Sequence, residues 1–273
     1  MTDRYAVIGN PISHSKSPLI HTMFARQTRE DISYEAIEAP LDGFAARVMA
    51  LRGKGYKGCN VTVPFKFEAF NLATQRSAQA EAAQAVNTLQ FSPDGDAILG
   101  DNTDGTGLIR DIRSNLGFVL HNKRVLLIGA GGAAYGVALP LAEAGAKLTI
   151  ANRTADKART LAASFSSLRP VVSSGSLDDI ADRQFDVVIN ATSAGLSGDR
   201  IPLPPTVFAS GALAYDMMYG RETPFMKFSR AQGAARVADG LGMLVEQAAE
   251  SFFIWRGIRP ETAPVIEALR KFQ

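Results

Sequence analysis

Short apolar runs alternate with amphipathic segments along most of the chain. The short runs are typical of buried strands, and segments with apolar residues every three or four positions are typical of helices. Strands are predicted at residues 5–9, 33–36, 58–63, 125–128, 147–151, 186–190, 213–217 and 236–238. Helices are predicted at residues 17–28, 41–51, 66–72, 133–144 and 242–256. A hairpin is predicted from strands at 86–91 and 98–101, with a turn at Pro93, Asp94 and Gly95.

Residues 124–136 read RVLLIGAGGAAYG, an apolar strand that meets a glycine-rich turn and then a helix of small residues. Glycine permits the tight turn and lets the backbone approach a pyrophosphate closely. The unpaired N–H groups and the positive end of the helix dipole then face the anion. This pattern predicts a nucleotide cofactor, bound at Gly129, Ala130, Gly131, Gly132 and Ala133.

The end of the next predicted strand indicates which dinucleotide is bound. An NAD enzyme usually places Asp or Glu there for the ribose hydroxyls, whereas this chain has Asn152, Arg153 and Thr154, with Lys157 one turn later. A carboxylate would repel a 2′-phosphate, while a guanidinium and a hydroxyl would bind it. We therefore expect NADP in preference to NAD.

Alternating strands and helices predict an α/β protein with largely parallel sheets. The amphipathic helix at 242–256 follows the last strand of the nucleotide-binding half, and we expect it to pack back on the first half. Two α/β domains with a cleft between them are therefore predicted. The first is discontinuous, 1–104 plus 240–273, and binds the substrate; the second, 105–239, is a Rossmann-like doubly wound parallel sheet that binds NADP.

Composition excludes several other classes. The net charge of +2 is too small to indicate nucleic acid or a membrane surface as partner. No apolar stretch reaches the ~20 residues of a membrane span, and the first residues lack a signal-peptide pattern. The single cysteine, Cys59, rules out an internal disulfide or a multi-cysteine metal site. We expect a cytoplasmic protein without a metal, either a monomer or a homodimer.

Polar clusters follow the predicted strands of the first half. Ser15 and Ser17 lie just before a helix, where one hydroxyl could cap the helix or both could bind a small polar substrate. Asn60 and Thr62 are two apart on a strand and so project to the same side, with Lys66 at the next helix start. The third cluster comprises Asn87 and Asp104, and Asp104 falls where the first half ends.

Nine motifs, in order, resemble those of the shikimate dehydrogenase family: NPISHSKSP, GCNVTVPFK, AVNTL, GDNTDG, GAGGA, NRT, NATSAG, YDMMYG and DGLGMLVEQAA. The match runs from Gly9 to about Gln247. The resemblance implies a two-domain oxidoreductase that uses NADPH to reduce 3-dehydroshikimate to shikimate in aromatic amino acid biosynthesis. The chain is similar to the NADP-using biosynthetic type.

The resemblance also implies roles for individual residues. Those implied to bind the substrate are Ser15, Ser17, Asn60, Thr62, Lys66, Asn87, Asp104, Tyr219 and Gln247, of which Lys66 and Asp104 are catalytic. Those implied to bind the cofactor are the glycine turn at 129–133, the loop residues Asn152, Arg153, Thr154 and Lys157, and further Thr192, Ser193, Met217 and Gly240. The chain departs from the family at Lys157, where many members have Arg, and at Phe67, where a polar residue is common.

Ketone reduction needs a hydride and a proton, and Lys66 as an ammonium can supply the proton. We expect Lys66 and Asp104 to titrate as one coupled unit; Asp104 alone as the base is the rival assignment. Other functions stay open: a dehydrogenase with relaxed substrate use that accepts quinate or NAD, a catalytically silent nucleotide-binding regulator, and a methyltransferase.

Overall fold

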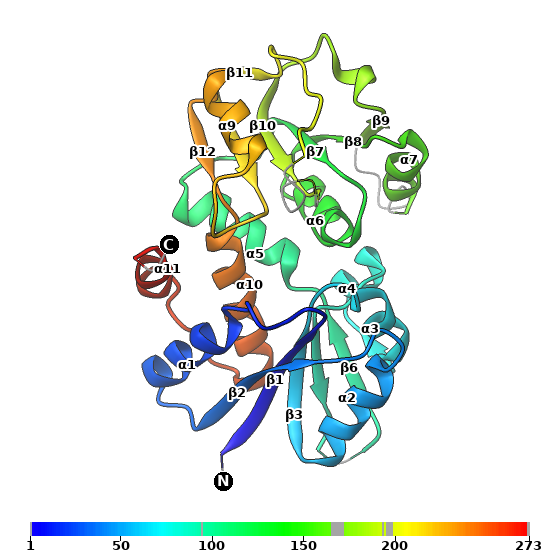
Figure 1. The fold of residues 1–273 in the computed structure, drawn as a ribbon, viewed down its shortest axis with the longest axis vertical. Coiled ribbons are helices and arrows are strands. Elements are labelled where there is room, and N and C mark those ends of the chain that lie inside the picture. The colour runs from blue at the N-terminus through cyan, green and yellow to red at the C-terminus, as the bar shows by residue number, and fades with distance from the viewer. Residues whose placement is uncertain (1, 94, 165–171, 193, 195–198, 272–273) are drawn as a thin grey trace. The chain divides into compact units, whose positions relative to one another are not determined.

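The computed structural model describes residues 2–93, 95–164, 172–192, 194 and 199–271. The chain divides into two compact units, one formed by Met1–Gly107 with Val245–Phe272 and the other by Leu108–Leu244. Each unit contains one six-stranded sheet with helices against it (Figure 1). The predicted pair of α/β domains, the second with a Rossmann-like parallel sheet, is confirmed. Asp94 and Ser193 lie outside the described residues, so the predicted turn at 93–95 is only partly described.

The first unit holds a mixed sheet in the order β2-β1-β3-β5-β6-β4. Its strands are β1 (Asp3–Gly9), β2 (Ile32–Glu38), β3 (Tyr56–Val61), β4 (Gln75–Arg76), β5 (Thr88–Phe91) and β6 (Ile98–Asp101). Its helices are α1 (Ser17–Thr28), α2 (Phe44–Gly53), α3 (Lys66–Leu72), α4 (Ala78–Ala83) and α11 (Ala263–Arg270). The helices α5 (Asp104–Arg110) and α10 (Leu241–Arg256) contribute residues to both units. β5 pairs antiparallel with β6, as the hairpin prediction requires, and also antiparallel with β3.

Strand alternation in β1 explains how this sheet buries both faces. Ala6 and Ile8 join Phe44 of α2 and Phe65 in one apolar cluster. Tyr5, directly before Ala6, points the other way and stacks on Trp255 of α10, with ring centroids 4.5 Å apart. Successive side chains of a strand point to opposite faces, so one strand serves two layers of helix.

The second unit holds a sheet in the order β12-β11-β10-β7-β8-β9, in which every neighbouring pair is parallel. Its strands are β7 (Arg124–Ile128), β8 (Lys147–Ala151), β9 (Val172–Gly175), β10 (Phe185–Asn190), β11 (Phe208–Asp216) and β12 (Arg236–Ala238). Its helices include α6 (Gly132–Glu143), α7 (Ala155–Ala163), α9 (Pro224–Ala231) and a π-helical turn at Asp111–Asn115. The strand order reverses direction beside β7, and ligands of such sheets bind at the carboxyl ends of the strands next to this point.

The core of the second sheet explains its uninterrupted apolar strands. Parallel strands are covered on both faces, so they carry continuous apolar runs. Leu126 and Ile128 of β7 pack in one cluster with Phe225 and Met226 of α9. Leu127, between them along the strand, is equally buried. Within the described part of the chain, the helices are too short or too polar to cross a membrane.

Candidate active site and nucleotide site

The first unit brings Lys66, Asp104 and Asn87 together. Lys66 begins α3, Asp104 begins α5, and Asn87 directly precedes β5. Lys66 Nζ donates to Asp104 Oδ2 at 2.5 Å, and Asn87 Nδ2 donates to Asp104 Oδ1 at 2.8 Å. The Asp104 side chain is buried, whereas that of Lys66 keeps 16% of its surface exposed. An ammonium that reaches solvent beside a buried carboxylate is suited to exchange protons with a bound molecule.

Backbone contacts explain why these three residues converge. Phe65, fully buried, stacks on Phe44 with ring centroids 4.9 Å apart and anchors the loop that ends at Lys66. The Val86 N–H donates to the Lys66 carbonyl at 2.9 Å, and the Asn87 N–H donates to the Asp101 carbonyl at 3.0 Å. The start of α3, the residues before β5 and the end of β6 are thereby held next to one another.

The Asn87 amide has a defined orientation. Its Oδ1 accepts the backbone N–H of Thr103 at 2.9 Å, a donor that cannot reverse its role. Its Nδ2 must therefore point the other way, toward Asp104 and toward Thr103 Oγ1 at 3.0 Å. Gln247 of α10 lies at the edge of this group, because its Oε1 is 3.4 Å from both Asn87 Nδ2 and Thr103 Oγ1. The side chains of Lys66, Asn87, Thr103 and Gln247 therefore form one ordered polar group beside the Asp104 carboxylate.

The Asn60 side chain is buried inside the first unit and does not lie at its surface. Only 6% of it is exposed, and its amide contacts Tyr34, Thr88 and Ser251. Thr62, two residues on, is half-buried at the end of β3, where its methyl group occupies the space that a side chain at Gly9 would need. Asn60 thus lies within β3 and is buried, whereas Thr62 lies just beyond the end of β3 and is half-buried.

The two serines lie where α1 begins. Ser17 is buried and Ser15 is half-buried. The Ser15 hydroxyl accepts the Ser17 N–H at 3.3 Å, so it is the Ser15 side chain that takes a free amide at the helix start. The Ser17 hydroxyl faces Tyr34 instead, where it opposes the effect of burial on the pKa of that phenol. The capping alternative considered for Ser17 therefore does not describe its side chain.

In the second unit, the glycine turn has the features of a phosphate cradle. Gly129 has φ +111°, and a Cβ there would lie 3.1 Å from the Thr192 methyl. Gly131 is the N-cap of α6 and has no side-chain cap. No described atom lies within 4 Å of the position where a Cβ of Gly131 would stand. The first N–H groups of α6 are therefore open to an anion. The small side chains of Ala130 and Ala133 leave room for the anion to approach them.

The loop after β8 presents exposed cations. Arg153, Thr154 and Lys157 are exposed, and Asn152 Nδ2 donates to the Thr154 carbonyl at 2.9 Å, which folds the loop into a turn. Gly129 lies beside this loop, because its N–H donates to the Ala151 carbonyl at 2.8 Å. The pyrophosphate cradle and the cationic loop are thus adjacent, as a phosphorylated adenosine would require.

A buried carboxylate organises the ends of β10 and β11. Asp216 accepts from Asn190 Nδ2 at 3.2 Å, from the Met218 N–H at 3.0 Å and from the Thr223 hydroxyl at 2.5 Å. Burial raises its pKa, and these donors oppose the rise. Asn190 Oδ1 in turn accepts the Thr192 N–H at 3.0 Å. Positions 192 and 217, both predicted to face the cofactor, are therefore held by the same group of hydrogen bonds around Asn190 and Asp216.

Gly240 lies against the same segment. A Cβ at this position would lie 2.2 Å from the Met217 carbonyl oxygen, and the Gly240 N–H donates to the Met218 carbonyl at 2.9 Å. Tyr219 follows directly; it is half-buried, and burial raises its pKa. It belongs to the second unit, so its meeting with the substrate residues of the first unit remains a prediction.

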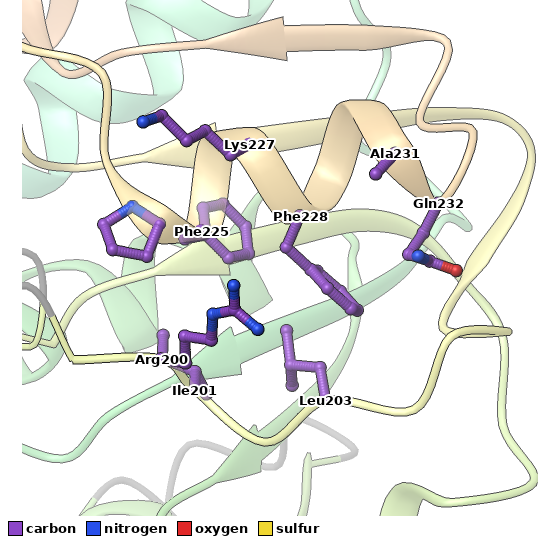
Figure 2. A pocket seen from close by; sticks show the side chains of 9 residues that line it. Arg200, Ile201, Leu203, Phe225, Lys227, Phe228, Ala231 and Gln232 are labelled. Carbon is purple, nitrogen blue, oxygen red and sulfur yellow. The ribbon is translucent and has the colours of Figure 1, made fainter.

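A cavity of about 530 Å³ in the second unit contains none of the predicted site residues. Figure 2 shows Phe225 and Phe228 of α9 on one side of it and Arg200, Ile201 and Leu203 on the other. It is lined by α9 rather than by the carboxyl ends of the strands, where ligands of such sheets bind.

Sequence reasoning missed several residues that order the site. Thr103 lies inside the GDNTDG motif and Thr88 follows Asn87, so both stood within segments already singled out. Tyr34 and Ser251 carried no such signal. Tyr34 reads as an ordinary strand aromatic, and Ser251 reads as a polar position on an amphipathic helix.

Comparison with known proteins identifies related chains. Models described as the shikimate dehydrogenase substrate binding domain, shikimate/quinate 5-dehydrogenase and the shikimate 5′-dehydrogenase C-terminal domain match residues 7–89, 112–197 and 240–270. The shikimate dehydrogenase (NADP(+)) of Methylobacillus flagellatus is 62% identical over 98% of this chain and 99% of its own.

Two solved structures are similar throughout. An Ael1 enzyme from Pseudomonas putida has a TM-score of 0.92 at 50% identity, covering 98% of each chain. Shikimate 5-dehydrogenase from Thermus thermophilus, in complex with NADP(H) and shikimate, has a TM-score of 0.87 at 32% identity, covering 99% of each chain.

Proposed function

Because the chain belongs to the shikimate dehydrogenase family, we propose that it catalyses the reversible, NADPH-dependent reduction of 3-dehydroshikimate to shikimate, a step of aromatic amino acid biosynthesis. The observation that carries this proposal is the ion pair between Lys66 and Asp104, in which Nζ and Oδ2 are 2.5 Å apart. A silent nucleotide-binding regulator would have no use for a partly exposed amine beside a buried, doubly hydrogen-bonded carboxylate.

The described residues fit NADP. Gly131 leaves open the space that a Cβ would fill, and the start of α6 is uncapped by any side chain. Arg153, Thr154 and Lys157 would hold the 2′-phosphate, and the 129–133 turn would hold the pyrophosphate. When bound, NADPH supplies the hydride. We propose that Thr192, Ser193, Met217 and Gly240 border the nicotinamide end.

The hydrogen bonds around Asp104 favour Lys66 as the group that carries the proton. Both carboxylate oxygens accept, Oδ2 from Lys66 and Oδ1 from Asn87. Hydrogen bonds to a carboxylate stabilise its charged form. Asp104 therefore stays ionised and keeps Lys66 an ammonium, which protonates the ketone oxygen as negative charge develops there. In the reverse direction the neutral amine takes the proton from the alcohol.

Substrate recognition is proposed to use neutral polar groups. Ser15, Ser17, Thr62 and Gln247 offer hydroxyl and amide groups to the carboxylate and hydroxyls of the substrate, together with Asn87. Tyr219 would add a hydroxyl from the second unit, across the cleft predicted between the domains. Such a site rejects an analogue that lacks an expected hydroxyl, because its own buried groups are left unpaired.

The test is an oxidation assay with shikimate and quinate, each with NADP+ and NAD+. We expect turnover with shikimate and NADP+ to exceed the other three combinations by at least about tenfold in kcat/KM. Equal turnover of quinate, or a preference for NAD+, would support the relaxed dehydrogenase instead. No turnover of either alcohol would support the silent regulator.

We also propose that the enzyme acts in the cytoplasm as a monomer or a homodimer. A need for NADPH and a single, fully buried free cysteine support the cytoplasmic assignment. Light scattering coupled to size-exclusion chromatography measures the mass directly and decides between one and two chains.

A further inference from the structure

The Asn60 side chain already makes hydrogen bonds inside the protein through both its oxygen and its nitrogen. Its Oδ1 accepts the Tyr34 hydroxyl at 2.7 Å. Its Nδ2 lies 2.9 Å from Ser251 Oγ, 3.1 Å from Thr88 Oγ1 and 3.2 Å from the Asn87 carbonyl. An amide has two N–H donors, and here both have protein acceptors. Asn60 thus has little capacity left for a substrate.

Ser251 of α10 lies at the centre of this buried group. It is fully buried, and its hydroxyl lies 2.8 Å from Thr88 Oγ1 and 3.3 Å from Thr103 Oγ1. It can also donate to the Gln247 carbonyl at 3.1 Å, one turn earlier in the helix. One hydroxyl therefore contacts residues from three other parts of the first unit.

The contacts lead from Ser251 to the catalytic carboxylate. The Thr88 hydroxyl donates to Asn87 Oδ1 at 2.9 Å, so its oxygen is free to accept from Ser251. Asn87 then donates from Nδ2 to Asp104 at 2.8 Å. The bonds can run in one direction, from Ser251 through Thr88 and Asn87 to Asp104, when the single Ser251 proton goes to Thr88 and not to the Gln247 carbonyl. Within a buried network of this kind, each bond polarises the next.

We propose that Asn60 and Ser251 are positioning residues, which hold the Asn87 amide and through it the Asp104 carboxylate, and that neither touches the substrate. This proposal rests on the proposed function, because it concerns the geometry of the Lys66–Asp104 pair. It changes the role of Asn60 from a substrate contact to a support, and it gives Ser251 a role that its place on a helix does not reveal.

The experiment compares Ser251→Ala with a matched variant, Ser229→Ala. Ser229 is also a fully buried helical serine, in α9, and it donates to the carbonyl one turn earlier at 2.8 Å. Steady-state shikimate oxidation with NADP+ is measured from about pH 6 to about pH 10. For Ser251→Ala we expect kcat to fall about threefold to tenfold, with KM for NADP+ unchanged. The acid limb of kcat/KM moves to higher pH, because the carboxylate loses support. Ser229→Ala keeps the wild-type profile.

Two further variants keep the test decisive if Ser251→Ala unfolds. Ser251→Cys preserves shape but weakens the hydrogen bonds, and we expect it to resemble Ser251→Ala in its pH profile. Tyr34→Phe removes the donor to Asn60 Oδ1 from the other side and shifts the profile in the same direction. Wild-type turnover with unchanged kcat and pH profile in all three folded variants would overturn the positioning role alone. An inactive wild type would overturn both this role and the proposed function.

Discussion

At the scale of single residues, the two members of the proposed acid–base pair have different surroundings. Lys66 has one carboxylate oxygen as its partner, while the other oxygen of Asp104 is taken by Asn87. The amine is the more exposed member, so it is the one that a substrate can reach. The pair is thus asymmetric: in the proposed mechanism Lys66 is the member that meets the ligand, and Asp104 is the member that positions Lys66.

Replacing Lys66 by Met removes the proton donor but keeps much of the side-chain volume. We expect kcat to fall about 100- to 10,000-fold, with KM for shikimate changed by less than about threefold, because the lost interaction develops in the transition state. Steady-state kinetics measure this split. Lys57→Met, an exposed lysine of β3, is the control and should behave as wild type. Near-normal turnover of Lys66→Met would exclude Lys66 as the acid.

His21 illustrates the opposite case, a buried titratable group that the chemistry does not use. It is fully buried and stacks on Tyr34 with ring centroids 4.1 Å apart. Neither ring nitrogen has a hydrogen-bond partner among the described residues. Burial lowers the pKa of His21 to about 3; the nearby Asn60 amide opposes this shift without reaching bonding geometry. The native state therefore holds the neutral ring.

This shift predicts a pH-dependent stability. The unfolded chain binds a proton at His21 near the ordinary pKa of about 6.5, whereas the folded chain binds it only near 3, so stability is full above pH 6.5 and falls as the pH drops toward 3. At about pH 4.5 the loss is about 2.7 kcal/mol. Urea unfolding of wild type and His21→Phe at neutral pH and at this acid pH should show the difference in the wild type only.

The control is His14→Gln, which removes an exposed histidine. It should lose stability with pH as the wild type does. An equal loss in His21→Phe would show that the acid sensitivity arises elsewhere.

At the scale of elements, ion pairs fix α10 and its tail to the first unit. Arg256 pairs with Asp3 of β1 and with Glu30 after α1. Arg259, beyond the end of the helix, pairs with Glu246 and Glu250 on the helix itself. These pairs flank Gln247, so the helix register that brings Gln247 and Ser251 to the site is held from both sides.

The loop after β8 should determine cofactor choice. Replacing Arg153 by Ala removes a charged donor for the 2′-phosphate, a contact worth about 1.5–3 kcal/mol, so KM for NADP+ should rise about 10- to 100-fold. KM for NAD+, which lacks this phosphate, should stay within about twofold. Arg159→Ala is the control, because Arg159 pairs with Asp156 at 2.7 Å on α7. Equal effects on both cofactors would contradict the assignment.

Sequence patterns revealed most of the strands but not β4 and β9. β7 was predictable because residues 125–128 are all apolar, whereas β4 has two residues and β9 reads VSSG. Such strands form because a neighbour offers hydrogen bonds, as β6 does for Gln75 and Arg76. The same limit applies to the site. Lys66 and Asp104 stood in motifs, while Ser251 acts through contacts with residues more than 140 positions away.

At the scale of the whole molecule, the predicted groups divide between the two units. The first unit holds the ion pair and the amide, hydroxyl and glutamine groups around it; the second holds the glycine turn, the cationic loop and Tyr219. We therefore expect shikimate to bind mainly to the first unit and NADP+ mainly to the second.

Hydrogen exchange tests this division. A ligand at about 100 times its Kd stabilises the state that binds it by about 2.7 kcal/mol, so exchange slows up to about 100-fold where opening is linked to binding. NADP+ alone should protect peptides from 124–136 and 147–157. Shikimate alone should protect peptides from 58–67 and 86–91. Protection by shikimate of the second sheet in preference to the first would contradict the assignment.

Gly240 has a wider consequence. The backbone entering α10 lies in direct contact with the peptide after β11, with no room for even a methyl group between them. The two segments are packed so closely that displacement of one requires displacement of the other. An alanine at 240 would push the Met217 carbonyl aside and so disturb the segment that continues through Met218 to Tyr219. Variation in this part of the protein must therefore leave position 240 untouched or rebuild both segments together.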